Sequence, residues 1–419
     1  MESYSELRWP DSTADEGGER APLRIWREVH ALEEEMVANR RWFHAHAELS
    51  FEEVETAAHV VRQLQSYGIC EIYQNVGVTG VVAMIRGEGG AGPTIGLRAD
   101  MDALPVQETA EVAYKSRNEG VMHACGHDGH MAELLCAARV IHETMRASMR
   151  GNIKLIFQPA EEGRGGAAAM IADGVLEDGP CGLRVDFVYG IHLWSFSKLG
   201  DVCCSNGPVM AASDKFEIAV LGKGGHGAAP QGTVDAIVEA ASVVTALQTI
   251  ISRNKDPLET GVVTCGTISG GYGYNVIADR VVITGTARSF SRETQELIKS
   301  RMGCICCGVA QTFGGEIDLK YEYGYPCTIN AYPECVSEVT LAASEIVGSS
   351  FAALPQKTMG AEDFSYFLQQ RPGCFFFVGA ALPGEPRPHH KSVFDFDERA
   401  MQIGSSVLVQ LVHNLLVKS

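Results

Sequence analysis

One stretch of nine residues concentrates side chains that bind metals or move protons. From Met122 to His130 the sequence reads Met-His-Ala-Cys-Gly-His-Asp-Gly-His, which holds one thiol and three imidazoles. Thiolate, imidazole and carboxylate are ligands of zinc and of other borderline divalent ions. The pattern indicates a metal site assembled from distant segments, and hydrolysis by metal-activated water is the chemistry that fits it. Three further groups of this kind are Glu161–Glu162, His192 and His389–His390.

The first two groups each have a structural alternative. Cys125 and His127 stand two apart where a predicted loop meets a helix, so both can face one pocket if the backbone is extended there. Otherwise they are a buried thiol beside a surface histidine. Glu161 and Glu162 follow a predicted strand, where one carboxylate can bind metal while the other takes a proton from metal-bound water. The alternative for this pair is a solvated acidic turn.

The later histidines are weak signals when each is taken alone. His192 ends an apolar strand, where a neighbour could simply cap it. His389 and His390 lie in a proline-rich loop and could belong to the surface. In open α/β sheets, however, sites form beyond the carboxyl ends of strands. The joint occurrence of these groups after predicted strands therefore favours one shared site.

Two aspartates and a further histidine extend the candidate set. Asp100 and Asp102 follow another predicted strand, where they could orient ligand imidazoles or cap the next turn. His226 lies among Gly224, Gly225 and Gly227. It could swing over a pocket and stabilise an oxyanion, or it could occupy an exposed glycine turn. These glycines do not match the dinucleotide-binding fingerprint, which must link a strand to a helix.

Composition limits the classes of protein that the chain can belong to. A length of 419 residues suggests two domains, and 46% hydrophobic with 21% charged residues is typical of globular proteins. The net charge of −18 argues against a nucleic-acid binder. Thirteen cysteines without paired metal-knuckle spacing favour a reducing cytoplasm, and no signal peptide or membrane-spanning apolar run is predicted.

The elements expected around these groups form an α/β fold. Strands alternating with helices predict a largely parallel sheet covered on both faces, a three-layer αβα domain. After residue 212 the order becomes β-α-β-β-α-β, the pattern of ferredoxin-like domains. We therefore expect an acidic, disordered tail over 1–21, a catalytic domain over 22–211 and 329–419, and an inserted lid over 212–328. The predicted strands are 78–86, 93–97, 153–157, 187–191, 214–221, 261–268, 280–287, 316–323 and 374–378. The predicted helices are 24–67 with a turn near 47–48, 128–146, 233–252, 291–313, 334–346 and 398–415.

The ordered motifs resemble the aminoacylase/carboxypeptidase-G superfamily of dinuclear metal amidohydrolases. The nearest subgroup holds the indole-3-acetyl-amino acid hydrolases, hippurate hydrolases and N-acetyl-diaminopimelate deacetylases. The resemblance implies a catalytic domain with two divalent ions, manganese or zinc, and a ferredoxin-like lid. It rests on Arg40-Arg41-Trp42-Phe43-His44, Leu97 to Pro105, His123 to His130, Gln158-Pro159-Ala160-Glu161-Glu162-Gly163, Gly224-Gly225-His226, Met359-Gly360-Ala361-Glu362-Asp363-Phe364 and Phe394-Asp395-Phe396-Asp397-Glu398.

Carried over by position, the resemblance also implies roles for individual residues. Glu161 is implied as general base and acid, and Asp102 is counted with it as a catalytic residue. His226 is implied as an oxyanion donor from the lid, in some relatives across a dimer, while Asn275 and Arg288 are placed to contact substrate. The implied metal ligands are Cys125, His127, Glu162, His192 and His390.

A few positions depart from the family pattern. Ala47 stands where relatives commonly carry proline, and the choice of His390 over His389 rests on the spacing to Phe394-Asp395. Plant auxin-conjugate enzymes often carry a leader and a retention tail, whereas this chain ends Leu416-Val417-Lys418-Ser419. We therefore expect a cytoplasmic enzyme.

The expected function is hydrolysis of N-acyl amino acids, such as indole-3-acetyl or hippurate-like conjugates. The alternatives are a dipeptidase or carboxypeptidase of the same superfamily, and a metal-binding descendant without turnover. The expected partner is a small-molecule substrate, with no nucleic acid and no membrane, and a homodimer could form through the lid.

Overall fold

The computed structural model describes residues 21–348, 357–384 and 386–418. The predicted disorder of the acidic tail falls almost entirely outside these residues. The chain divides into two compact units, each with its own hydrophobic core. The first unit comprises 1–207, 329–356 and 366–419, and the second comprises 208–328 and 357–365.

The first unit is built on a seven-stranded sheet with the order β1-β2-β4-β3-β5-β15-β6. The four central strands are parallel to one another, and antiparallel pairs close both edges. The central strands are almost continuously apolar and buried, as expected for strands covered on two faces. Their bounds are β1 Ile72–Val76, β2 Gly80–Arg86, β3 Gly90–Asp100, β4 Arg150–Gln158, β5 Phe187–Lys198, β6 Val202–Cys203 and β15 Gly373–Ala381.

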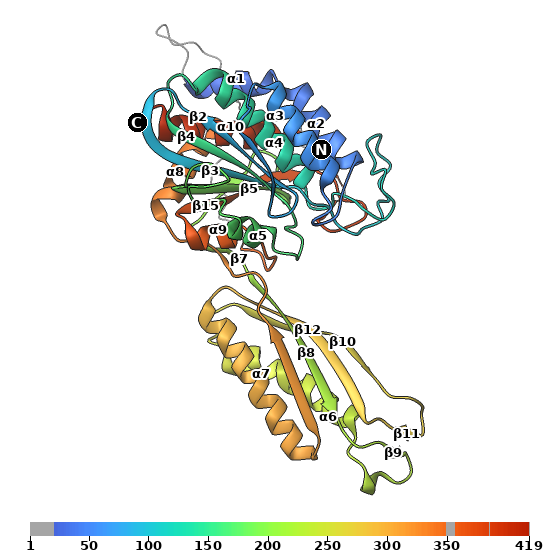
Figure 1. The fold of residues 1–419 in the computed structure, drawn as a ribbon. Coiled ribbons are helices and arrows are strands. Elements are labelled where there is room, and N and C mark those ends of the chain that lie inside the picture. Colours follow the sequence, from blue (N-terminus) through green and yellow to red (C-terminus); the bar gives the residue numbers. More distant parts are fainter. Residues whose placement is uncertain (1–20, 349–356, 385, 419) are drawn as a thin grey trace. The chain divides into compact units, whose positions relative to one another are not determined.

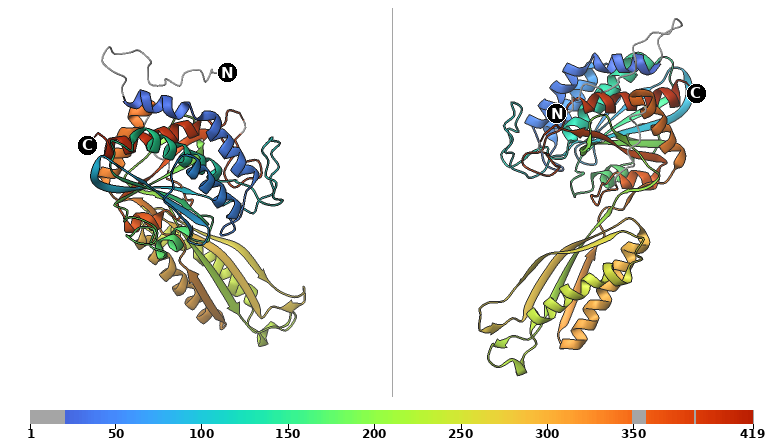
Figure 2. Two further views of the ribbon diagram at one scale, coloured as in Figure 1. Left: turned by 45° about the horizontal axis from the view of Figure 1, so that its top comes forward. Right: turned by 180° about the vertical axis from the view of Figure 1, so that it is seen from behind.

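Helices cover both faces of this sheet (Figures 1 and 2). α4 and α10 pack against the strands on one face, with α1, α2, α3 and α8 around them. The short helices α5 and α9 lie on the opposite face, so the unit has the predicted αβα layers. The helices are α1 Ala21–His30, α2 Glu33–Ala45, α3 Val54–Ser66, α4 His127–Val140 with the π-helical turn η1 Ile141–Met145, α5 Gly166–Ala172, α8 Pro333–Val347, α9 Ser365–Gln370 and α10 Ala400–Leu416.

Helix α4 carries much of the predicted site, and its start is fixed by a glycine. Gly126 has φ of +99°, a left-handed conformation that glycine adopts without strain, so the loop can turn directly into the helix. Gly129, in the first turn, leaves no room for a side chain, since an added Cβ would lie 2.5 Å from Leu193. The first turn of α4 therefore packs closely against strand β5.

The second unit is a four-stranded antiparallel sheet with the order β10-β12-β8-β13 and two helices on one face. The element order is the β-α-β-β-α-β expected from periodicity, and segment 357–365 joins the unit as well. Short strands β7 Gly207–Met210 and β14 Thr328–Asn330 lie where the chain passes between the units. The other elements are β8 Ala212–Leu221, β9 Gly225–His226, η2 Pro230–Gly232, α6 Ala236–Thr249, η3 Ile250–Asn254, β10 Gly261–Gly270, β11 Val276–Ile277, β12 Arg280–Ser289, α7 Arg292–Phe313 and β13 Glu316–Glu322.

One helical segment among the described residues, Ala236–Asn254, is long and apolar enough to pass a length-and-composition test for a membrane span. The sequence pattern predicts no membrane-spanning run here. Its inward residues Ala236, Ala240, Val243 and Leu247 belong to the core of the second unit. Packing against the sheet therefore accounts for its apolar face.

Candidate metal centre

The predicted ligands of the first unit converge beyond the ends of the parallel strands. Ligand atoms of Cys125, His127 and His192 all lie within 4.8 Å of one another. The same limit holds for Cys125, Glu162 and His390, and for His127, Glu161 and Glu162. These three overlapping groups bring together all five implied ligands and the implied base, although their positions in the chain span 125 to 390.

His127 is held with one ring nitrogen bonded and the other directed into the cluster. It is the first residue of α4, and its Nδ1 lies 2.8 Å from the backbone oxygen of Asp102. Its Nε2 is buried without a hydrogen-bond partner among the described residues, 3.9 Å from Oε1 of Glu162. A ring nitrogen fixed on one side and open on the other is the arrangement of a metal-binding histidine.

The electrostatic field at His127 is strongly negative. Burial lowers the pKa of its imidazole, but the carboxylates of Asp100 and Asp102 outweigh burial and raise it to about 10. Burial acts in the opposite sense on Asp100, whose pKa nevertheless stays well below its ordinary value because of Arg98, His127 and His130. Carboxylates that favour a proton on His127 also favour a divalent cation in its place.

The surroundings of His192 favour its neutral imidazole, whereas those of His127 favour the charged form. It lies on β5, fully desolvated, and burial together with His130 lowers its pKa well below the ordinary value. Its Nδ1 is 2.7 Å from the backbone oxygen of Leu193, and its Nε2 is 3.6 Å from Sγ of Cys125. A neutral imidazole is the form that binds metals, so His192 is prepared to act as a ligand.

The loop that carries Glu161 and Glu162 is fixed by its backbone. The N–H groups of these two residues donate to the two carboxylate oxygens of Asp102, at 2.9 and 3.0 Å. The preceding N–H, of Ala160, donates to Glu53 at 2.8 Å, and Ala160 adopts φ of +54°. Three successive backbone groups are therefore held by two buried carboxylates, which leaves the two glutamate side chains to face the cluster.

The two adjacent histidines separate into different environments. His389 donates through Nδ1 to the backbone oxygen of Cys125 at 3.2 Å, and its Nε2 accepts the N–H of Ser195 at 3.1 Å. His390 has φ of +63°, and its Nε2 lies 3.4 Å from Oε1 of Glu162. The geometry supports His390, rather than His389, as the ligand.

Sequence reasoning missed two contributors to this centre. His130 was counted in the motif without a role; its Nδ1 is 2.7 Å from Asp100, and its Nε2 accepts the N–H of Leu193 at 2.9 Å. Glu53 was not singled out, and its carboxylate accepts the N–H of Ala160, 107 residues away, in the loop that carries Glu161. The spacing of His130 in the histidine-rich segment was a usable signal for the first, but no local pattern marks the second.

The remaining predicted residues belong to the second unit. His226 is exposed on β9, which pairs with β11, and Asn275 lies beside it because its backbone oxygen accepts the N–H of Gly227 at 2.8 Å. Arg288 lies on β12, half-buried, and burial lowers its pKa. Their roles toward substrate stay predictions.

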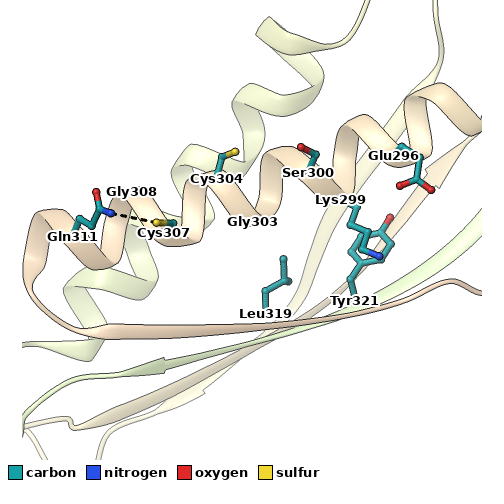
Figure 3. Close-up of a pocket in the computed structure, with 10 residues that line it drawn as sticks. All are labelled: Glu296, Lys299, Ser300, Gly303, Cys304, Cys307, Gly308, Gln311, Leu319 and Tyr321. Atoms are coloured by element: carbon teal, nitrogen blue, oxygen red, sulfur yellow. Dashed lines mark hydrogen bonds between the residues drawn. The ribbon is translucent and has the colours of Figure 1, made fainter.

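A groove in the second unit lies apart from these residues. It has a volume of about 900 Å³ and is formed between α7 and β13 (Figure 3). Cys304 and Cys307 line it, and Gln311 donates to the sulfur of Cys307 at 3.4 Å. Among the described residues, none of the groups of three metal-ligating side chains lies at this groove.

The donor set fits the metal ions that the sequence implied. Soft sulfur, neutral imidazole and carboxylate converge, and both Nε2 of His127 and Oε1 of Glu162 are buried without hydrogen-bond partners in the described part of the chain. Leaving such atoms unpaired costs about 1–3 kcal/mol each, which metal binding would offset. The site thus has the features of a centre for divalent ions in a hydrolase.

Comparison with known proteins defines the family. The model of Peptidase family M20/M25/M40 matches residues 96–414, and the chain belongs to this family. It is a metal-binding hydrolase that acts on C–N amide bonds, and both the resemblance drawn from the motifs and the predicted fold class are confirmed.

Individual relatives cover nearly the whole chain. It is 40% identical over 399 residues to thermostable carboxypeptidase 2 of Saccharolobus solfataricus, covering 94% of this chain and 97% of the relative. It is 40% identical over 390 residues to the N-acetyl-L-cysteine deacetylase of Bacillus subtilis, covering 93% and 90%. The crystal structure of the Bacillus subtilis YXEP protein, described as a dinuclear metal binding peptidase, has a TM-score of 0.79 at 32% identity, covering 92% and 99%.

Proposed function

We propose that the protein hydrolyses the amide bond of N-acyl amino acids, with Glu161 as general base and general acid. The observation that carries this proposal is the position of Glu161. Its carboxylate lies within 4.8 Å of ligand atoms of His127 and Glu162, and the residue is only 6% exposed. A carboxylate held beside metal ligands, where water is largely excluded, has the location that a general base requires.

The metal ligands in this proposal are the five residues that converge on the cluster. Two divalent ions, manganese or zinc, would be held by Cys125, His127, Glu162, His192 and His390. When bound, such ions act as Lewis acids and make water a stronger acid near neutral pH. The fit of the donor set, including the unpaired atoms of His127 and Glu162, supports this assignment.

The chain's own residues then move the proton and hold the geometry. Glu161 accepts a proton from the attacking water and passes it to the nitrogen of the departing amino acid. Asp102 keeps Glu161 in place through the backbone hydrogen bond of 2.9 Å. His226 would donate to the oxyanion, and Asn275 and Arg288 would contact the substrate. Each donor aimed at an oxyanion contributes about 3 kcal/mol to transition-state stabilisation.

The substrate class is supported by a relative. The Bacillus subtilis relative is named for the deacetylation of N-acetyl-L-cysteine, an N-acyl amino acid. A second candidate is a carboxypeptidase or dipeptidase, which the name of the Saccharolobus solfataricus relative favours. Both reactions release a free amino acid from an amide. They differ in the group on the carbonyl side of that amide, which is a simple acyl group in the first case and an amino acid or peptide in the second. A cytoplasmic location and a homodimer through the second unit stay predictions.

The test is a substrate panel with a matched pair of variants. Purified protein is given hippurate, indole-3-acetyl-alanine, N-acetyl amino acids and dipeptides, with and without a chelator. Glu161→Gln should lower kcat by about 10²–10⁴-fold while bound metal is unchanged, because the variant loses the base but keeps the ligands. The control is Glu119→Gln, an exposed glutamate of the same unit.

The outcomes separate the candidates. Chelator-sensitive release of amino acid from acyl conjugates supports the proposal, and turnover of dipeptides alone supports the carboxypeptidase alternative. If Glu161→Gln keeps activity within a few-fold of the wild type, Glu161 is not the base. Metal bound in full with no turnover on any substrate would favour a descendant that only binds metal.

A further inference from the structure

Two thiols of the first unit approach each other at a place that hydrolysis does not use. Cys204 follows strand β6, and Cys374 is the second residue of β15. Their Sγ atoms are 3.1 Å apart. Ordinary contact between carbon atoms is about 3.5–4.0 Å, and sulfur is larger than carbon, so this pair is closer than packing alone requires. Forming a disulfide would shorten the separation to about 2.05 Å.

The backbone on both sides of the pair is already held in position. Strands β6 and β15 are antiparallel neighbours, with Cys203 opposite Phe377. The buried side chain of Asn330 ties the next residues together: its Nδ2 donates to the backbone oxygens of Ser205 and Phe375, both at 2.9 Å, and its Oδ1 accepts the N–H of Phe375 at 2.8 Å. Residues adjacent to both cysteines are therefore fixed by one amide, so the sulfurs can join with little backbone movement.

The two thiols differ in access to solvent. Cys204 is partly exposed, whereas Cys374 is fully buried. Burial and the neighbouring Cys204 raise the pKa of the Cys374 thiol well above its ordinary value. A small oxidant can therefore reach Cys204 first, and Cys374 stays protonated beside it.

We propose that Cys204 and Cys374 form a reversible oxidation site that a hydroperoxide converts into an intramolecular disulfide. The thiolate of Cys204 attacks the peroxide, so an S–O bond forms, the O–O bond breaks, and an alcohol or water leaves. The sulfur of Cys374 then attacks the sulfenic acid, so the S–S bond forms and the S–O bond breaks. The thiol proton leaves with the hydroxyl group as water. Two thiols are oxidised and one peroxide is reduced.

The disulfide would join the end of the first segment of the first unit to the central sheet. The first unit ends its initial segment at Gly207, three residues after Cys204. β15 pairs with β5, where Cys374 is opposite Tyr189 and Phe377 is opposite His192. The cross-link would therefore fasten the exit from the first unit to the strand beside a predicted ligand, without using any predicted ligand itself. This inference does not depend on the proposed substrate.

The experiment uses the full-length, metal-loaded protein treated with hydrogen peroxide under native conditions. Free thiols are alkylated, and peptides are mapped by mass spectrometry without reduction. The expected result is a linked pair of peptides containing Cys204 and Cys374, with accessible thiols after unfolding falling from thirteen to eleven per chain. Dithiothreitol should restore all thirteen. The oxidised chain should have a higher Tm than the reduced chain.

Variants distinguish this pair from other thiols. Cys204→Ser and Cys374→Ser should each abolish the linked peptide and the Tm rise, while Cys203→Ser, a change at the adjacent buried thiol, should leave both unchanged. If a variant does not fold, the wild-type peptide map alone decides the question. A link from Cys374 to Cys335, links only between exposed cysteines of different chains, or oxidation of exposed Cys70 with Cys204 and Cys374 left free would each overturn the proposal.

Discussion

Two buried aspartates, one in each compact unit, collect hydrogen bonds in the same way but serve different partners. Asp102 of the first unit and Asp214 of the second are 1% and 3% exposed. Asp102 accepts the hydroxyl of Ser50 at 2.6 Å and the backbone N–H groups of Glu161 and Glu162. Its partners are thus the predicted base and a predicted ligand.

Asp214 joins three elements of the second unit. It accepts the side-chain amide of Gln295 on α7 at 2.8 Å and the hydroxyl of Tyr321 on β13 at 2.6 Å. The N–H of Gly324 donates to it at 3.2 Å. These partners fix a helix and an edge strand to β8, and none of them is a candidate for catalysis.

The comparison shows that a buried carboxylate with three donors does not by itself mark a reactive site. Such a group needs donors wherever it occurs, because an unpaired buried charge is costly. What distinguishes Asp102 is the identity of its donors and the presence of His127 at 3.4 Å. The groups around a buried carboxylate, and not its burial or its number of donors, therefore indicate whether it takes part in a reaction.

The largest effect is expected from a substitution that tests whether a residue of the second unit takes part in the reaction. His226→Ala should lower kcat by about 10²–10³-fold, since an oxyanion donor is lost. Bound metal and Tm should stay at the wild-type values because the side chain is exposed on β9. The control is Gln231→Ala, an exposed residue of the neighbouring η2. Equal kcat values for wild type and His226→Ala would restrict the chemistry to the first unit.

A smaller effect separates the two aspartates directly. Asp102→Asn should weaken metal binding or activity by about 10–100-fold, the usual result of removing a group that orients ligands. Asp214→Asn should lower thermal stability to a similar degree as Asp102→Asn but leave metal affinity unchanged. Metal titration and thermal unfolding of both variants check this expectation. Equal losses of metal affinity in both would show that the aspartates act only through stability.

The smallest effect comes from deleting one hydroxyl at each aspartate. Ser50→Ala and Tyr321→Phe each remove a donor 2.6 Å from its carboxylate. Each should lower the free energy of unfolding by about 1–2 kcal/mol, as for hydrogen bonds to charged groups. Only Ser50→Ala should also change metal affinity, because only Asp102 holds the predicted ligand loop. A change in metal affinity with Tyr321→Phe would contradict this distinction.

The fold could be predicted largely because its central strands and helices have strong patterns. The apolar run Ile153–Phe157 and the in-phase residues of α7 are long, regular signals. Strand β1, Ile72–Val76, was missed because it is an edge strand with two exposed residues, and such a strand carries no continuous apolar pattern. Segment 357–365 was assigned to the first domain because only three-dimensional contacts connect it with the second unit.

The candidate site could be predicted where residue types are distinctive and not where they depend on tertiary contacts. Cys125 and His127 are conspicuous in the sequence, and they do lie together. Glu53 is one of several glutamates in an acidic stretch, and only folding brings it to Ala160. The sequence favoured His390 over His389 by its spacing to Phe394-Asp395, and the backbone supports that prediction, because His390 has a positive φ and its Nε2 lies 3.4 Å from Oε1 of Glu162.

The position of β15 has a consequence for biosynthesis. Strands β5 and β6 are separated by only three residues in the chain, yet β15 lies between them in the sheet. A growing chain that has not reached Gly373 therefore exposes the edge of β5, a surface that invites wrong pairing. His390, a predicted ligand, is made later still, so the predicted metal centre joins residues far apart in the sequence and assembles late. During translation we expect this protein to need protection of β5, and to acquire its full metal affinity only after residue 390 has been synthesised.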